Sequence, residues 1–367
     1  MVLFIGVFLF SSTKGRRVSN ILLGTFFFAI GLNLADTFLL LKQVYFNLPA
    51  LALWGSNLLL ICGPCIYLYT QSVVYKDFKF DKKKLRHFYA FIILFVVTEV
   101  SYLSAGYEIQ TRILISIVER KIPPSVYIGS LVIYIHFLTY LFVSLRLTGQ
   151  YSIAASDKYS EAGKVTLQWL NTIIIFFLVL MMVSFIGGWL SFLSLTAAYF
   201  FVITLTIFLL LLFIVFMLFK ALQNPEIFAV LEEKEIQEAV LTPRYTSSVL
   251  PGDEKARVLG NLQQYMQAQK PYLEPELNLD KLAGLIAVKP KVLSQVINEL
   301  LQQNFFEFVN FYRIEDAKKL LVNPKDKKIT VLEVMYEVGF NSKSSFNTLF
   351  KRNTGLTPSD YKKQNMQ

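Results

Sequence analysis

The sequence contains few of the side chains that build disulfide frameworks, metal sites and redox centres. Only two cysteines and two histidines occur among 367 residues, which excludes a disulfide scaffold. These four residues are scattered, so their spacing gives no metal-binding cluster, and we predict no cofactor. Charged residues make up only 17% of the chain, whereas an ordinary soluble domain has about 25%.

The two cysteines have the Cys-x-x-Cys spacing of thioredoxin-like proteins, in Cys62-Gly63-Pro64-Cys65. That redox chemistry requires an exposed helix N-terminus that stabilises a thiolate. Here the motif lies within the apolar run LLLICGPCIYLY, so we interpret it as a proline-kinked helix with two small apolar thiols. The sequence also lacks a nucleophile elbow, a P-loop and paired catalytic carboxylates. We therefore predict that the protein is not an enzyme.

Long hydrophobic runs, in contrast, are abundant before Lys220. Hydrophobic residues make up 54% of the chain, and the mean hydropathy is +0.48. A spanning helix needs about 20 apolar residues, and six segments reach or nearly reach that length. The first of seven is shorter: it is a truncated span, the result of a start site placed too late, or a segment in the membrane interface. We treat it as a span, since it lacks the features of a removed signal peptide. The seven predicted segments are 1–13, 20–41, 48–74, 88–107, 123–147, 168–190 and 192–219.

Basic residues are divided unevenly between the loops that join these segments. Eleven Lys and Arg lie in one set of loops and four in the other, namely 11–19, 75–87 and 148–167 against 42–47, 108–122 and 191. The positive-inside rule assigns the first set to the cytoplasm. Seven spans then put the N-terminus outside and the C-terminus in the cytoplasm.

Three polar residues interrupt the apolar segments. Asn33 and Asp36 are three residues apart and share a helix face, and Glu99 lies in the fourth segment. Ionisable groups in a membrane are costly and usually point into a helix bundle. One interpretation is interhelical hydrogen bonding or a position near an interface. The other is a pocket that binds an unknown signal ligand.

The composition changes after Lys220. Residues 220–253 contain a helix-prone acidic stretch and a Pro- and Ser-containing linker, and are predicted to form a cytoplasmic connector. Residues 254–367 are predicted to form a soluble domain, and residues 251–367 hold seventeen Lys and Arg against thirteen Asp and Glu. Glu254–Gln269 is amphipathic and is predicted to pack on that domain through Val258, Leu262 and Met266.

Two stretches of this domain, Leu279–Leu300 and Ile329–Phe350, have the same organisation: a short amphipathic helix, a tight break and a second helix. The first break falls at Val288–Pro290, where Pro290 is suited to a first helical position. Gly339 supplies the second turn, because glycine readily adopts positive φ. Two such units predict tandem helix-turn-helix elements, which place helices in the DNA major groove.

The segment between the units, Asn304–Val322, has the apolar spacing of one long helix, about 28 Å in length. That length is close to the roughly 34 Å between successive major grooves on one face of DNA. The runs FFEFVNFYRIEDAKKLL and EVGFNSKSSFNTLFKRNTGLTPSDYKK resemble the DNA-binding domain of AraC-type transcription regulators. The resemblance covers about the last ninety residues and implies duplex DNA as a partner.

The resemblance implies recognition helices at Pro290–Leu300 and Ser342–Lys351. The outward positions expected to contact DNA bases are Lys291, Ser294, Gln295 and Asn298 in the first helix and Lys343, Ser344, Asn347 and Thr348 in the second. Lys351 and Arg352 are better placed for phosphates. The alternative is that these residues form solvated helix faces. The first helix departs from the family pattern, because Lys289 stands where a Ser or Thr cap is usual.

The predicted fold is all-α: a transmembrane helix bundle in residues 1–219, followed by a soluble domain of two helix-turn-helix units joined by a long helix. We expect a membrane-bound one-component transcription regulator, multi-pass in the bacterial cytoplasmic membrane, that binds specific duplex DNA, responds to an unknown signal and forms a homodimer. The alternative is a membrane receptor or transporter whose C-terminal domain docks a protein partner. DNA binding by the C-terminal domain discriminates between the two.

Overall fold

The computed structural model describes residues 2–12, 16–75, 77–119, 124–161, 167–223, 251–322 and 329–365. Within these residues the regular elements are helices, and one isolated antiparallel bridge pairs Tyr159 with Asn278. The described chain divides into two compact units. The first comprises the residues up to Thr148 and those from Gln168 to Gln223; the second comprises Gly149–Glu161, Leu167 and the residues from Pro251 onward.

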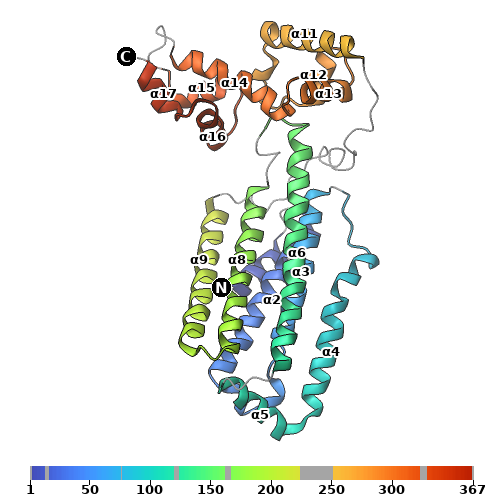
Figure 1. Cartoon of the computed structure of the whole chain (residues 1–367), viewed down its shortest axis with the longest axis vertical. Helices are drawn as coiled ribbons and strands as arrows, with labels where there is room; N and C mark the ends of the chain where they lie inside the picture. The colour runs from blue at the N-terminus through green and yellow to red at the C-terminus, as the bar shows by residue number, and fades with distance from the viewer. Residues whose placement is uncertain are drawn as a thin grey trace. The chain divides into compact units, whose positions relative to one another are not determined.

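The first unit is a bundle of long helices, which are coloured blue to yellow-green in Figure 1. Its helices are α1 (Val2–Ser11), α2 (Arg17–Leu41), α3 (Leu59–Val74), α4 (Tyr89–Ser104), α5 (Gly106–Val118), α6 (Pro124–Ser156), α8 (Gln168–Phe192) and α9 (Thr196–Gln223). Short 3-10 turns join them: η1 (Val44–Phe46), η2 (Pro49–Leu51), η3 (Ser56–Leu58) and η4 (Lys82–Phe88). The last turns of α6 belong to the second unit.

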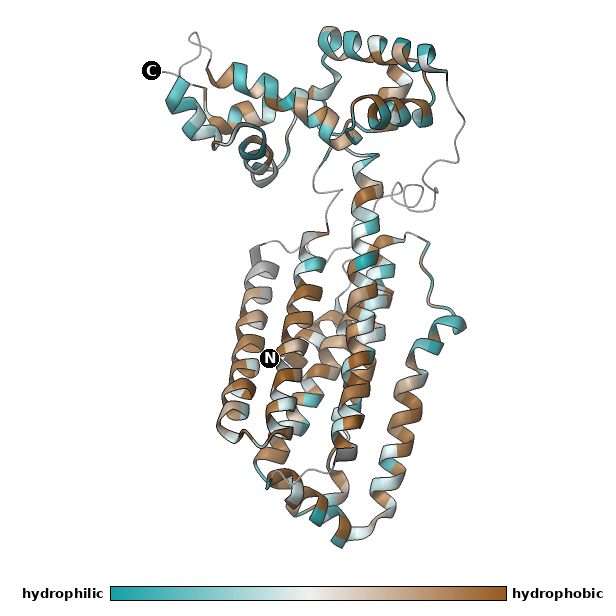
Figure 2. Ribbon diagram, in the orientation of Figure 1, coloured by the Kyte–Doolittle hydropathy of each residue, from teal (hydrophilic) through white to brown (hydrophobic). Residues whose placement is uncertain are grey.

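Among the residues that the structure describes, six stretches are long and apolar enough to cross a membrane, and brown apolar residues dominate their helices in Figure 2. They are Arg17–Leu41, Pro49–Val74, Lys82–Ser104, Val126–Ser156, Trp169–Phe192 and Thr196–Phe213. These stretches match the six longer segments predicted from the sequence. The first predicted segment forms α1, whose ten residues extend only about 15 Å.

The loop prediction for 108–122 was wrong in its larger part, because α5 (Gly106–Val118) occupies it. This segment is amphipathic and buries Gln110 and Leu114, while its ion pair of Glu108 and Arg112 lies on the exposed side. Its charged residues interrupt the apolar run, so hydropathy alone does not indicate this helix.

Close packing and aromatic contacts hold the bundle together. A Cβ atom on Gly6 of α1 would lie 3.1 Å from the Gly24 carbonyl oxygen of α2, so the close approach of these helices requires glycine. Phe26 of α2 is fully buried, and its ring centroid lies 4.8 Å from that of Phe177 in α8 and 6.4 Å from that of Phe137 in α6. Three helices therefore share one aromatic core.

The two cysteines are free thiols buried within α3, and Pro64 lies inside the same helix. Their burial agrees with the interpretation of Cys62 and Cys65 as packing residues. Among the described residues, no group of three or more His, Cys, Asp or Glu side chains could hold a metal ion.

The second unit contains α11 (Gly252–Gln269), η6 (Pro271–Leu273), α12 (Leu279–Leu285), α13 (Pro290–Leu300), α14 (Phe305–Leu321), α15 (Val331–Glu337), α16 (Lys343–Thr354) and α17 (Pro358–Asn365). Its described residues form two hydrophobic cores, one at each end of α14. The predicted stripe of Val258, Leu262 and Met266 is buried, and the latter two belong to the first core. Residues 224–250, most of the predicted connector, lie outside the described residues.

Candidate nucleic-acid interface

The long helix α14 supports both helix-turn-helix units. It begins with a capping box, in which the Asn304 side chain accepts a hydrogen bond from the Glu307 amide and the Glu307 carboxylate accepts one from the Asn304 amide. Its 17 residues extend about 25 Å. Phe305 and Phe308 at its start pack in the first core, while Ala317 and Leu321 at its end pack in the second.

The first unit consists of α12 and α13. The Asn278 side chain caps α12 by accepting a hydrogen bond from the Lys281 amide at 2.9 Å. The chain reverses at Ala287, which has a φ of 55°. Pro290 is the first residue of α13, and Lys289 makes no side-chain cap, as the sequence predicted. Leu293, Val296 and Ile297 of α13 are fully buried.

The second unit consists of α15 and α16. The Thr330–Glu333 capping box begins α15, and the Ser342 hydroxyl caps α16. Gly339 has a φ of 87°, and a Cβ there would lie 2.7 Å from the Leu273 carbonyl oxygen. Glycine is therefore required at this turn both by its backbone conformation and by the close approach of the chain. Phe346 and Phe350 anchor α16 in the second core.

The outer face of α16 presents the polar residues that the sequence predicted. Lys343, Ser344, Thr348, Lys351 and Arg352 are exposed, and Asn347 is half-buried. One guanidinium nitrogen of Arg352 lies 3.4 Å from a carboxylate oxygen of Glu307, on α14. Because that pair is largely exposed, it holds the arginine weakly and leaves it available to a phosphate. The face combines amide, hydroxyl and ammonium groups, which suit the edges of base pairs.

The corresponding face of α13 differs from the prediction. Lys291 is exposed and Asn298 is half-buried, but Ser294 is only 2% exposed and Gln295 only 9%. The expectation that Ser294 and Gln295 point outward was therefore wrong for this structure. The Ser294 hydroxyl accepts a hydrogen bond from the Asn298 amide, and the Gln295 amide donates one to Glu299. Glu299 in turn forms an ion pair with Lys255 of α11 at 2.7 Å, so α11 packs beside this face.

A buried polar network in the middle of α14 was not predicted from the sequence. Arg313 is 1% exposed, and its guanidinium donates hydrogen bonds to the carbonyl oxygens of Tyr272 and Glu274, both at 2.7 Å. Burial lowers the pKa of Arg313 to about 10, which the nearby Glu161 carboxylate partly opposes, so the side chain is charged at neutral pH. Its guanidinium carbon also lies 5.5 Å from the Phe340 ring centroid, in the second core.

The three polar residues of the bundle make mainly structural contacts. Asp36 is 3% exposed and accepts a hydrogen bond from the Tyr45 hydroxyl at 2.8 Å, while Asn33 donates one to the Gly55 carbonyl at 3.1 Å. Both residues therefore fasten α2 to the turns before α3. Glu99 is half-buried on α4, within electrostatic range of Asp36.

Comparison with known proteins shows that the C-terminal domain is similar to helix-turn-helix domains. Residues 282–364 match a family described as "Helix-turn-helix domain". The chain is 33% identical over 88 residues to an uncharacterized HTH-type transcriptional regulator in the cgkA 5' region of Pseudoalteromonas carrageenovora, covering 24% of this chain and 50% of that protein. It is 27% identical over 124 residues to the HTH-type transcriptional activator RhaR of Escherichia coli K12, covering 34% and 42%.

Among solved structures, the C-terminal domain of AraT, a response regulator from Geobacillus stearothermophilus, aligns with 33% of this chain and 91% of that chain at 26% identity, with a TM-score of 0.27. This chain spans half or less of the length of the two curated relatives named above. The C-terminal region is a double helix-turn-helix domain. This region is similar to the helix-turn-helix domains of these transcriptional regulators.

Proposed function

We propose that this protein is a membrane-embedded one-component transcription regulator. The observation that carries the proposal is the presence, in one chain, of six helices apolar enough to cross a membrane and a C-terminal AraC-type helix-turn-helix domain. A regulator of this design senses its signal in the membrane region and binds duplex DNA with the C-terminal domain.

The proposed orientation follows from the loop charges. The more basic loops face the cytoplasm, where DNA is accessible. This assignment of the C-terminal domain does not depend on α1. The basic loop before α2 lies in the cytoplasm in this assignment, and six spans, an even number, return the chain to the same side. If α1 is a seventh span, it changes only the side on which the N-terminus lies.

Base reading is assigned to the polar faces of the two recognition helices. Asn347 can pair bidentately with adenine and Lys343 can donate to guanine, while Ser344 and Thr348 fit either base. Lys351 and Arg352 contact phosphates and supply affinity without sequence preference. Lys291, Ser294, Gln295 and Asn298 of α13 are assigned to a second site about one helical turn away. Ser294 and Gln295 are buried in this structure, so they read that site only after they become accessible.

The signal is assigned to the membrane region, with the polar residues Asn33, Asp36 and Glu99 as its candidate pocket. Ligand binding that displaces the Tyr45 hydroxyl from Asp36 would release the turns before α3. Two copies of the chain associate through the bundle. This association tethers their DNA-binding domains, which raises the effective concentration of one domain near the other.

The test is selection of DNA by the full chain in lipid nanodiscs, using a pool of random duplexes. We expect one sequence class to be enriched, with affinity that falls steeply as salt rises. Lys343→Ala and Asn347→Ala should each cost about 1–3 kcal/mol of base discrimination. The matched variants Lys351→Ala and Arg352→Ala should weaken binding to all duplexes alike and each reduce the salt slope by about 1. Absence of DNA binding would support the receptor or transporter alternative.

A further inference from the structure

The end of α6 and the residues after it form part of the C-terminal unit. Tyr159 and Ser160 are 2% and 1% exposed. The Leu279 amide donates a hydrogen bond to the Lys158 carbonyl at 2.9 Å, in the bridge that pairs Tyr159 with Asn278. We call residues 149–161 the docking segment. It lies more than 100 residues before α12 in the chain, yet its backbone pairs with the start of that helix.

Ser160 completes the buried network around Arg313. Its carbonyl oxygen accepts hydrogen bonds from Asn310 at 3.0 Å and from Arg313 at 3.5 Å, and its hydroxyl donates one to the Leu277 carbonyl at 2.5 Å. A buried guanidinium and a buried amide that lose an acceptor pay a desolvation penalty. These contacts hold the docking segment in one specific position and make docking favourable.

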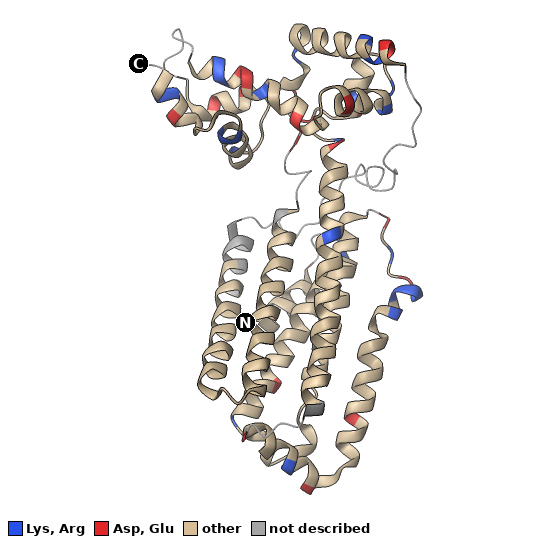
Figure 3. Ribbon diagram, in the orientation of Figure 1, with Lys and Arg blue, Asp and Glu red and all other residues tan. Residues whose placement is uncertain are grey.

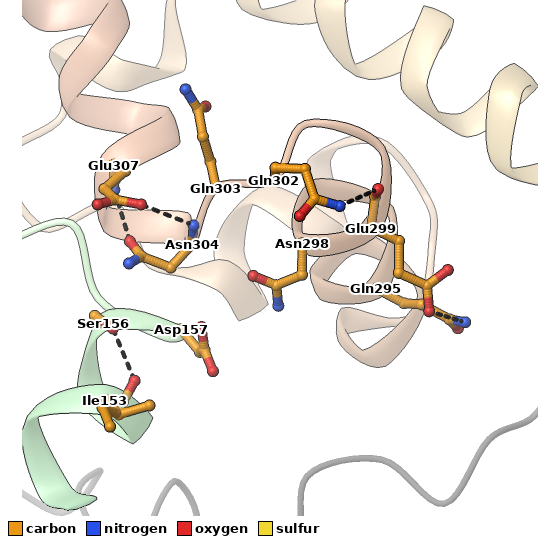
Figure 4. Close-up of a pocket in the computed structure, with 10 residues that line it drawn as sticks. All are labelled: Ile153, Ser156, Asp157, Gln295, Asn298, Glu299, Gln302, Gln303, Asn304 and Glu307. Atoms are coloured by element: carbon orange, nitrogen blue, oxygen red, sulfur yellow. Dashed lines mark hydrogen bonds between the residues drawn. The ribbon is translucent and has the colours of Figure 1, made fainter.

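The docked segment lies opposite the base-reading face of α13. A hollow of about 650 Å³ separates them; it is lined by Ile153, Ser156 and Asp157 from the docking segment, Gln295, Asn298 and Glu299 from α13, and Gln302, Gln303, Asn304 and Glu307 (Figure 4). Base reading requires a helix face to enter a major groove about 12 Å wide between two phosphate backbones. The docking segment forms the opposite wall of the hollow in front of this face.

The lining of this hollow differs in charge from the face of α16. It contains three carboxylates, those of Asp157, Glu299 and Glu307, and no Lys or Arg, while Glu299 and Glu307 are paired with Lys255 and Arg352. The lining itself therefore offers a phosphate no basic group. The exposed face of α16, in contrast, carries Lys343, Lys351 and Arg352. Figure 3 shows basic residues on α16.

We propose that the docking segment is an intramolecular mask of the first recognition helix, and that its release is the step that allows both helices to read DNA. With the segment docked, the protein reads only the half-site of α16. Because α6 (Pro124–Ser156) is one continuous helix that begins in the predicted span 123–147 and ends in the docking segment, a change in that span is transmitted directly to the mask. This proposal rests on the proposed function.

A disulfide lock tests the mask. Directly opposed residues of such a bridge have Cα atoms about 4.5–5.5 Å apart, within the range for a disulfide, so Tyr159→Cys with Asn278→Cys can be oxidised in the docked state. The full chain in nanodiscs is used, with oxidised and reduced samples selecting from the same random duplex pool. The oxidised protein should enrich only the half-site read by α16. The reduced protein should enrich both half-sites, and each single-cysteine variant should be insensitive to oxidant.

A release variant gives the opposite result. Ser160→Leu places a bulky side chain in a fully buried position and removes the Leu277 contact, so it should bind the two-half-site duplex about tenfold more tightly. Ser152→Leu, on the half-buried surface of the same segment, is the matched control and should leave the affinity unchanged. This arm keeps the proposal falsifiable if the double-cysteine chain does not fold.

The outcomes separate the two proposals. If the oxidised lock still enriches both half-sites, or Ser160→Leu does not tighten binding, the mask is refuted while DNA recognition stands. If no form of the protein enriches any duplex, the proposed function fails and the mask fails with it.

Discussion

Gly339 and Gly355 both have positive φ, at 87° and 78°, but their surroundings differ. A Cβ on Gly355 would meet nothing within 4 Å, whereas one on Gly339 would meet two carbonyl oxygens, of Leu273 and Tyr272, at 2.7 and 2.9 Å. The crowding at Gly339 joins the turn of the second helix-turn-helix unit to η6. The Tyr272 oxygen also accepts the Arg313 hydrogen bond, so this turn supports the centre of the domain.

Replacement of each glycine by alanine separates backbone strain from crowding. Gly355→Ala should cost about 1 kcal/mol, because only the left-handed conformation is strained. Gly339→Ala should cost about 1–3 kcal/mol more, because the new methyl group displaces backbone oxygens. Hydrogen exchange of the α15 and α16 amides in the full chain measures the local opening free energy. If the two substitutions lower the local opening free energy equally, crowding at Gly339 contributes nothing to the cost.

Sequence reasoning located Gly339 but not Arg313, and the reason is physical. A glycine between two amphipathic helices has a local signature, since the turn conformation depends on that residue itself. The nearest partners of Arg313 are the backbone carbonyls of Tyr272 and Glu274, both at 2.7 Å, which leave no side-chain pattern in the sequence. Within the run FYRIEDAKK the arginine resembles any polar residue of a helix. Only the tertiary fold brings its acceptors together.

Among the elements, α14 depends on a charged cluster at Asp316. This carboxylate accepts hydrogen bonds from Lys270 and Tyr272 at 2.8 Å and from Lys319 at 3.0 Å. Burial alone would raise the pKa of Asp316, but these hydrogen bonds outweigh it and hold the pKa below its ordinary value. The cluster fastens the residues after α11 to the long helix.

The sign of this shift predicts acid sensitivity. The Asp316 carboxyl has a lower pKa in the folded domain than in the unfolded chain, where its pKa is about 4. The ionised carboxylate therefore stabilises the folded domain fully at pH values above about 4, and this stabilisation is lost as the pH falls through the pKa of the folded state. Denaturation of the C-terminal domain in the full chain, followed by hydrogen exchange between pH 3 and 6, should show this loss. Asp316→Asn should start less stable and lose less over the same interval.

Glu315→Gln provides the neighbouring control. Glu315 pairs with Lys318 along the surface of the same helix at 2.7 Å, and such pairs contribute little. This variant should retain the acid dependence of the natural protein. If Asp316→Asn retains it as well, the acid sensitivity has another source.

The two recognition helices show how far helical periodicity predicts an interface. Both helices were predicted correctly, because burial of apolar residues every three or four positions is a local property. The outer face of α16 is exposed as expected. On the face of α13, Ser294 and Gln295 are buried, and α11 packs beside that face. The helical periodicity of a sequence predicts which face of a helix is polar, but not which other segments pack against that face.

For the whole molecule, hydropathy predicted six long apolar helices well, since the length and composition of a span are local. It did not predict that residues 149–161, expected to be a loop between spans, belong to the C-terminal unit. Their pairing with α12 depends on one backbone bridge and one serine, neither of which has a sequence signature. A division of the chain by composition alone therefore separates residues that fold together.

The orientation of the chain is the prediction on which DNA access depends. Alkaline phosphatase is active only outside the cytoplasm, so fusions after Asn47 and after Gln367 should be active and inactive, respectively. A fluorescent protein that folds only in the cytoplasm should give the reverse pattern. Neutralising Lys82, Lys83 and Lys84 removes half of the six basic residues in loop 75–87 and should produce a mixed orientation, because that charge retains the loop on the cytoplasmic side. An active phosphatase at the C-terminus of the natural sequence would separate the domain from the chromosome and refute a regulatory role.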